Sequence, residues 1–327
     1  MKLTMGLNPY GLTYYLGIQA MGTPRANPNG AGLEGFIKLI EELGGKAIEI
    51  WEGWLKPMSD AELAAFKTRL DGLGWERVLS SGLHHGDVDF LLRAAPILGA
   101  RYIRLALTPI LCGDRAAAGQ RWYDLVNSTR QKLEHYAPLA EAAGVTLLIE
   151  NHQDFTSREL VGFCDEFGPN VRIVFDMANT FPVAESPIDF TRVIAPYVRH
   201  CHVKDYRVQF TDDGYRLCRC PSGDGCVPFK EMFEILGQHN DEMVACIEIG
   251  ALEARHVRLL TPEWWHGYAP KPAEDLAACL LAAQKNRFEP GEDYRTPWER
   301  NADHELIDYE LGQYRKSAAN LKTLGLM

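Results

Sequence analysis

Eight short apolar runs recur along this chain of 327 residues, and longer amphipathic stretches separate them. The runs are almost continuously apolar rather than alternating, which is typical of parallel strands that are covered on both faces. Eight strand–helix units in sequence predict a closed (β/α)₈ barrel, or TIM barrel, with an open doubly wound sheet as the competing fold. The predicted strands are residues 3–7, 47–51, 78–83, 102–107, 145–150, 171–176, 198–203 and 244–249.

The end of the chain departs from this repeat. Helical spacing of apolar residues predicts helices near 33–43, 125–143, 156–167 and 230–236, and residues 272–285 are expected to form the eighth barrel helix. We therefore expect one catalytic barrel domain over residues 1–287. The charged residues 288–327 contain a further amphipathic pattern, which predicts a helical extension that packs on the barrel or on a partner subunit.

Charge and hydropathy exclude two classes of partner. The formal net charge of −10 leaves no basic stripe for nucleic acid, which this surface would repel at long range. No segment approaches the roughly 18 apolar residues that a membrane-spanning helix needs. The first residues also lack the apolar core of a secretion signal, so we expect a cytoplasmic protein.

Four ionisable residues follow one another at the ends of the last four predicted strands: Glu150, Asp176, His202 and Glu248. The first two intervals are 26 residues each, about one strand–helix unit. The third is 46 residues, and a glycine-rich insertion at residues 222–225 lies within it. Because the carboxyl ends of barrel strands meet at one rim, we expect these four side chains to lie together there.

Such a cluster needs a compensating charge. Three carboxylates packed together at the ends of apolar strands raise one another's pKa values and resist joint ionisation. A divalent cation removes that conflict, and oxygen ligands with a single imidazole suit Mn²⁺ best, with Mg²⁺ or Co²⁺ as alternatives. The sequence therefore predicts one metal ion held by all four residues.

The segments around these residues carry a resemblance to a known family. Leu148-Ile149-Glu150-Asn151-His152, Val174-Phe175-Asp176, residues 200–205 (His-Cys-His-Val-Lys-Asp) and residues 247–250 (Ile-Glu-Ile-Gly) occur in the order found in xylose-isomerase-like TIM barrels. The chain resembles the sugar phosphate isomerase/epimerase family, which includes ketohexose 3-epimerases, over residues 3–285. The resemblance implies that Glu150, Asp176, His202 and Glu248 are the metal ligands. It also implies that Glu150 and Glu248 are the acid/base pair.

Two positions depart from the epimerase pattern. Many relatives carry a histidine three residues after the ligand aspartate, where this chain has Asn179. The epimerases carry an arginine six residues after the ligand histidine, where this chain has Val208 with Arg207 beside it. Both differences put a ketohexose substrate in doubt. We expect His152 to act as a third catalytic group or to support the metal, and the expected substrate-binding residues are His84, His85, Asn179, Lys204, Arg207 and Trp51.

The leading hypothesis is a metal-dependent enzyme that abstracts a proton next to the carbonyl of a sugar, as an isomerase or epimerase. The main alternative is a lyase on an oxidised 3-keto sugar, such as a dehydratase or the catalytic subunit of a C-glycoside-cleaving enzyme. An endonuclease of the related barrel family is a remote alternative, and a barrel that only binds or assembles is a fourth. We expect a sugar or glycoside ligand and a homo-oligomer, or a hetero-oligomer with a small second subunit.

Overall fold

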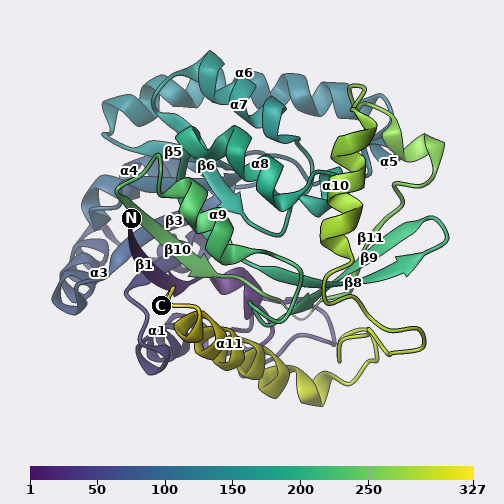
Figure 1. The fold of residues 1–327 in the computed structure, drawn as a ribbon. Coiled ribbons are helices and arrows are strands. Elements are labelled where there is room, and N and C mark those ends of the chain that lie inside the picture. Colours follow the sequence, from purple (N-terminus) through teal and green to yellow (C-terminus); the bar gives the residue numbers. More distant parts are fainter. Residues whose placement is uncertain (251) are drawn as a thin grey trace.

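The computed structural model describes residues 1–250 and 252–327 and contains a closed barrel of eight parallel strands (Figure 1). All eight predicted strands are present, with bounds within two residues of those expected. The TIM barrel is thus confirmed, and the open sheet is excluded. Around the barrel the order is β1-β10-β7-β6-β5-β4-β3-β2. The strands are β1 (Lys2–Leu7), β2 (Ala47–Trp51), β3 (Glu76–Gly82), β4 (Tyr102–Ala106), β5 (Thr146–Glu150), β6 (Val171–Asp176), β7 (Val198–Val203) and β10 (Glu242–Ile247).

Helices cover the outside of the barrel, and local sequence fixes where several of them begin and end. Gly44 ends α1 with φ of 81°, a left-handed conformation that glycine adopts without steric cost. Thr156 and Glu159 form a reciprocal capping box at the start of α7. The helices are α1 (Gly32–Leu43), α2 (Glu52–Leu55), α3 (Asp60–Leu73), α4 (Val88–Leu98), α5 (Arg115–Ala118), α6 (Arg121–Ala142), α7 (Ser157–Phe167), α8 (Pro187–Ile194), α9 (Phe229–Leu236), α10 (Ala273–Ala283) and α11 (Leu306–Thr323).

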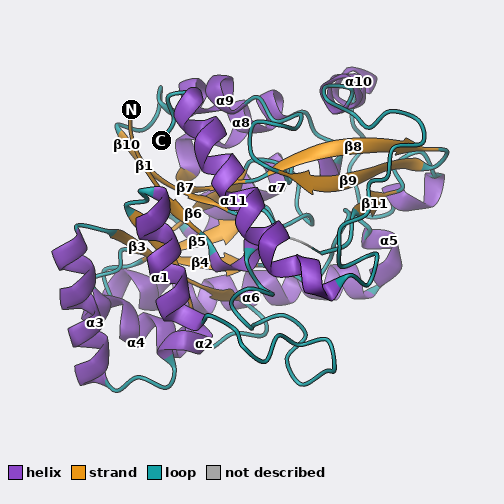
Figure 2. Ribbon diagram, turned by 90° about the horizontal axis from the view of Figure 1, so that it is seen from below, coloured by secondary structure: helices purple, strands orange, loops and turns teal. Residues whose placement is uncertain are grey.

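Two strands, β8 and β9, are inserted after β7 and account for the long third interval between the predicted ligands; β11, which follows β10, joins them in a three-stranded antiparallel sheet. Its order is β11-β9-β8, with bounds β8 (Asp205–Thr211), β9 (Gly214–Cys220) and β11 (Arg255–Val257). Since β8 starts one residue after Lys204, the sheet leaves the barrel at the carboxyl end of β7, and Figure 2 shows β8 and β9 projecting beyond the barrel. We call it the inserted sheet.

The expected eighth barrel helix lies elsewhere. Cys279 of α10 contacts the hydroxyl of Tyr215 on β9, so this helix packs on the inserted sheet. The barrel position beside α1 belongs instead to α11, in yellow in Figure 1, whose Arg315 pairs with Glu42 and whose Lys322 donates to the carbonyl of Leu43. The prediction for residues 272–285 was therefore right about a helix and wrong about its place. The chain between β10 and α11 first adds β11 and α10 to the inserted sheet, so the helix that closes the repeat comes later in the sequence than spacing alone predicts.

Among the described residues, no helix combines the length and apolar character that crossing a membrane requires.

Candidate metal centre and pocket

The structure brings the four predicted ligands together at the carboxyl ends of four neighbouring strands. Glu150 and Asp176 are the last residues of β5 and β6, His202 lies one residue before the end of β7, and Glu248 follows β10. Each offers a ligand atom, and these atoms all lie within 4.8 Å of one another. All four residues are buried, with exposed fractions of 0–6%. This geometry is the one that a single cation would need.

The imidazole of His202 provides a test of whether a cation fits. Its Nδ1 atom lies 2.9 Å from Glu150 Oε1 and 2.9 Å from Glu248 Oε2. One N–H can donate well to only one of them, and Glu248 Oε2 has no hydrogen-bond partner. A buried acceptor without a partner is costly. A cation bound between these atoms would satisfy the nitrogen and both carboxylates, so the donor set fits a metal ion.

Two basic side chains also reach this cluster, and sequence reasoning placed only one of them near it. Arg104, on β4, donates to a carboxylate oxygen of Glu150, and its guanidinium lies 5.0 Å from the ring centre of Tyr10. Lys204 donates to Asp176 Oδ2 and, over 2.7 Å, to Glu248 Oε1. Each ligand carboxylate therefore has a positive partner, which holds it in place and would compete with a metal for it.

The pKa values reflect these opposing influences. Burial raises the pKa of Asp176 to about 6, even though Lys204 opposes the shift. Burial acts in the same direction on Glu248, but the charges of Lys204 and His202 together outweigh it and hold its pKa well below the usual value. For His202, burial is opposed by the nearby carboxylates of Glu49 and Glu248, which raise its pKa well above the usual value. Metal binding at this imidazole would therefore have to displace a proton.

A second buried layer lies beneath the four ligands. Glu49, on β2, has an Oε2 atom 2.7 Å from His202 Nε2 and 2.9 Å from His200 Nε2. Asn8 Nδ2 also lies 3.3 Å from His202 Nε2. A carboxylate at Nε2 favours the tautomer that carries its proton there and leaves Nδ1 free to bind a metal. The structure buries Glu49 fully, so this carboxylate belongs to the site and not to the solvent-exposed surface.

A cavity of about 420 Å³ reaches the cluster at Glu248, which lines it together with Arg104 and Lys204. Ser81 Oγ, Arg104 Nε and His152 Nδ1 are buried without hydrogen-bond partners, and their residues all line this cavity. We call it the metal pocket. Buried polar atoms in native proteins are normally paired, so these atoms indicate where a polar ligand would be held.

Five of the predicted substrate or catalytic residues line the metal pocket: Trp51, His85, His152, Lys204 and Glu248. Burial lowers the pKa of His152 to about 4, although the charge of Glu150 opposes the shift. The imidazole is consequently neutral near pH 7, so it can accept a proton or a hydrogen bond there.

Three of the predicted substrate-binding residues do not line the metal pocket. His84 Nε2 contacts the hydroxyl of Thr129 at 3.0 Å. Asn179 donates to Asp176 Oδ2 over 2.7 Å and accepts from the hydroxyl of Tyr206. It therefore fixes the position of the candidate metal ligand Asp176. Arg207 points to the opposite side of the inserted sheet from the pocket residues, where it pairs with Glu292.

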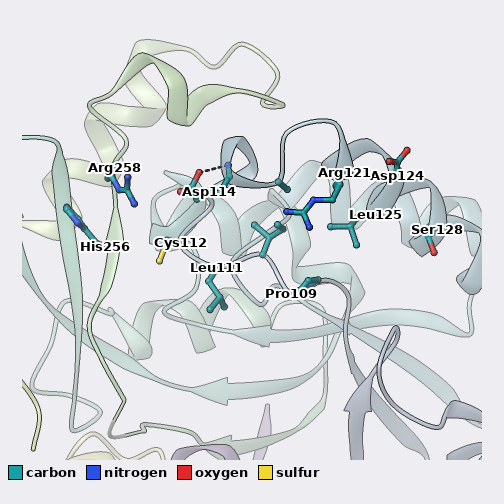
Figure 3. A pocket seen from close by; sticks show the side chains of 13 residues that line it. Pro109, Leu111, Cys112, Asp114, Arg121, Asp124, Leu125, Ser128, His256 and Arg258 are labelled. Carbon is teal, nitrogen blue, oxygen red and sulfur yellow. Dashed lines mark hydrogen bonds between the residues drawn. The ribbon is translucent and has the colours of Figure 1, made fainter. Parts of the chain in front are cut away.

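A second, larger cavity of about 770 Å³ adjoins the metal pocket (Figure 3). The two cavities share Pro109 and Leu111 in the loop after β4. Figure 3 shows His256 and Arg258 on one side of Cys112, and Arg121 and Leu125 on the other. The space next to the candidate site is thus larger than a single monosaccharide requires.

Arg104 and Glu49 could have been found from the sequence. Each is the single charged residue within an otherwise apolar strand, in Tyr-Ile-Arg-Leu-Ala and in Ala-Ile-Glu-Ile-Trp. A charge in such a strand is expensive unless it is paired, and that cost is itself a signal of a buried polar site.

Comparisons with known proteins agree with this architecture. Over 177 residues the chain is 27% identical to the uncharacterized protein YihM of Escherichia coli K12; the match covers 54% of this chain and only about half (52%) of YihM. A solved D-psicose 3-epimerase with D-tagatose, from Clostridium cellulolyticum H10, has a TM-score of 0.57 and 17% identity, over 99% of this chain and 98% of its own.

A xylose isomerase-like TIM barrel protein from Mycobacterium smegmatis, solved in complex with magnesium, has a TM-score of 0.52 and 17% identity. That match covers 75% of this chain and 87% of the other. At these identities the two solved structures establish a common fold. The family model of xylose isomerase-like TIM barrels matches residues 37–265, more than half of the sequence, and the chain therefore belongs to that family.

Proposed function

We propose that this protein is a divalent-metal-dependent enzyme that moves a proton next to the carbonyl of a sugar or sugar derivative, as an isomerase or epimerase. The observation that carries the proposal is the set of four buried ligand atoms within 4.8 Å of one another, next to a pocket that Glu248 lines and whose residues include buried polar atoms without partners. A divalent cation, for which Mn²⁺ is the first choice, would act there as a Lewis acid toward substrate oxygens.

The acid/base roles fall to Glu150 and Glu248. Their strands, β5 and β10, are separated by β6 and β7, so the two carboxylates approach the metal centre from different strands of the barrel. One removes a proton from the carbon beside the carbonyl, and the other returns a proton to the opposite face, which inverts that carbon. Return of the proton to the adjacent carbon gives aldose–ketose isomerisation instead. Arg104 and Lys204 keep both carboxylates ionised and ready to accept a proton.

The test is deuterium exchange in heavy water with a panel of sugars and keto sugars and added Mn²⁺. The expected result is label at one carbon adjacent to the carbonyl, and loss of that exchange in Glu150→Gln and in Glu248→Gln. Glu52→Gln is a matched control, because Glu52 also lines the metal pocket but accepts a hydrogen bond from the backbone of Asp87 rather than contacting the four ligands. Exchange retained in both ligand variants would refute the acid/base assignment.

A second candidate function is a lyase on an oxidised glycoside, and the adjoining 770 Å³ cavity favours it. A group attached to the sugar could occupy that space, and expulsion of a leaving group β to the carbanion would follow the same first proton abstraction. Product analysis with a 3-keto glycoside separates the two reactions. Release of the aglycone identifies a lyase, whereas an isomerised glycoside with its aglycone still attached identifies an isomerase or epimerase.

A further inference from the structure

Two arginines of the inserted sheet face the metal pocket from the same side. In the register of β9 and β11, Arg255 lies opposite Leu217, and Arg219 follows Leu217 by two residues. Residues that face each other across two strands share a face of the sheet, and so do residues two apart on one strand. Arg219 and Arg255 are therefore diagonal neighbours on one face, and both line the metal pocket together with Lys204 and Glu248.

These two guanidinium groups have few partners among the described residues. Arg219 donates one hydrogen bond, over 3.0 Å, to the carbonyl of Glu253, and Arg255 donates one, over 2.8 Å, to the carboxylate of the same residue. A guanidinium has five N–H donors. Arg255 Nε is buried without a partner, and the arginine side chain is only 14% exposed. Burial lowers the pKa of Arg255, and the positive charge of Arg219 lowers it further.

The other basic groups of the pocket differ from this pair. Arg104 and Lys204 are each held by a ligand carboxylate. Of the two arginines, only Arg255 contacts a carboxylate among the described residues, whereas Arg219 contacts a backbone carbonyl. Two positive groups that repel each other and retain free donors are the usual arrangement for binding an anion. Gly250, with φ of 98°, leaves room beside them, because a Cβ atom there would come within 3.2 Å of Arg219 Cδ.

We infer that Arg219 and Arg255 bind an anionic group of the substrate, a carboxylate or a phosphate, while the rest of the sugar lies against the metal centre. This rests on the proposed function and narrows its substrate class to acidic sugar derivatives. Planar guanidinium groups pair with the oxygens of either anion through parallel N–H donors. The anion would lie at the edge of the metal pocket nearest the second cavity. Arg255 lines the metal pocket, whereas His256 and Arg258, which follow it in the chain, line the second cavity.

The first experiment measures binding of inorganic phosphate, and separately of acetate, to the metal-free full-length protein by calorimetry or by ³¹P and ¹³C NMR titration. Arg219→Gln and Arg255→Gln should each weaken binding of the preferred anion by about tenfold, which is the usual scale for a charge-assisted hydrogen bond. Arg258→Gln is the matched control, because it removes the same charge close by but on the side of the second cavity. It should change the affinity less than twofold.

The second experiment distinguishes the two anions and separates this inference from the proposed function. Binding of a hexose, the corresponding hexonate and the hexose phosphate is compared in the wild type and in both variants, with Mn²⁺ affinity measured on the same samples. The variants should lose preference for one acidic sugar while keeping the Mn²⁺ affinity of the wild type.

Equal losses in Arg258→Gln, or no loss in Arg219→Gln and Arg255→Gln, would overturn the inference and leave the metal centre untouched. If Mn²⁺ fails to bind to any of these proteins, the proposed function fails, whereas the phosphate and acetate affinities still decide whether the arginine pair binds anions.

Discussion

The barrel and the inserted sheet differ in how they bury and pair their basic side chains. At the barrel rim, Arg104 and Lys204 are buried and paired with ligand carboxylates, so each charge is held in one place. On the inserted sheet, Arg219 and Arg255 are only partly buried, and among the described residues Arg255 pairs with the carboxylate of Glu253 while Arg219 contacts only its backbone carbonyl. The barrel thus fixes the groups that would perform the chemistry, whereas the sheet presents donors that a ligand can complete. Substitutions in the barrel should affect every substrate, and substitutions in the sheet should change which substrate is preferred.

The largest change in Mn²⁺ affinity should come from Glu49→Gln, in the buried layer beneath the four candidate ligands. An amide at this position no longer provides the carboxylate that favours a proton on His202 Nε2, so Nδ1 becomes a poorer ligand. We expect Mn²⁺ affinity to fall by about 10- to 100-fold, the usual cost of losing such a partner. Calorimetric titration measures it, and circular dichroism confirms that the variant is folded. Unchanged Mn²⁺ affinity would show that the buried layer does not act on the metal centre.

Substitution of Lys204, where the barrel meets the inserted sheet, should raise the Mn²⁺ affinity by an intermediate amount. Lys204 lies between β7 and β8 and provides a positive charge to Asp176 and Glu248. Lys204→Met removes the cation that competes with a metal, so Mn²⁺ affinity should rise by about tenfold, the scale of one nearby charge. Proton exchange with substrate should fall at the same time. Weaker Mn²⁺ binding in this variant would mean that Lys204 organises the carboxylates rather than competing for them.

The smallest effect concerns Glu310 of α11, outside both regions. Burial raises its pKa to about 8, although it accepts hydrogen bonds from the backbone N–H groups of Tyr14 and Tyr15. Between the ordinary glutamate pKa near 4.5 and about 8, the folded protein binds more protons here than the unfolded chain. The free energy of unfolding should therefore fall as pH rises through this window. Denaturant titrations across it should show a shallower decrease for Glu310→Gln, and an unchanged slope would contradict the assignment.

Much of the barrel and its four candidate ligands could be predicted because both depend on a repeat. Near-continuous apolar runs mark buried parallel strands, and the interval of one strand–helix unit places Glu150, Asp176 and His202 on one rim. Burial and charge type then indicate a cation. The roles of these residues remain predictions that the proposed experiments test.

What could not be predicted depends on contacts between segments that are distant in sequence. The partnership of Glu49 with His202 joins residues 153 positions apart. The inserted sheet has no counterpart in the repeat, so neither the place of α10 nor the facing of Arg219 and Arg255 follows from spacing. Arg207 illustrates the same limit. It is adjacent to Val208, the position at which the epimerases carry an arginine, but the pleat of β8 turns Arg207 to the other face of the sheet, where it pairs with Glu292.

The contacts of α11 have a consequence for the order of assembly during synthesis. Tyr314 donates its hydroxyl proton to the carbonyl of Asn8, and Glu310 holds the backbone of Tyr14 and Tyr15, beside pocket residues Tyr10 and Thr13. These segments, about 300 positions apart, meet only after every barrel strand has left the ribosome. A nascent chain that lacks α11 would hold all four candidate ligands but not the contacts that support Tyr14 and Tyr15, so the pocket wall should be complete only once α11 has been made.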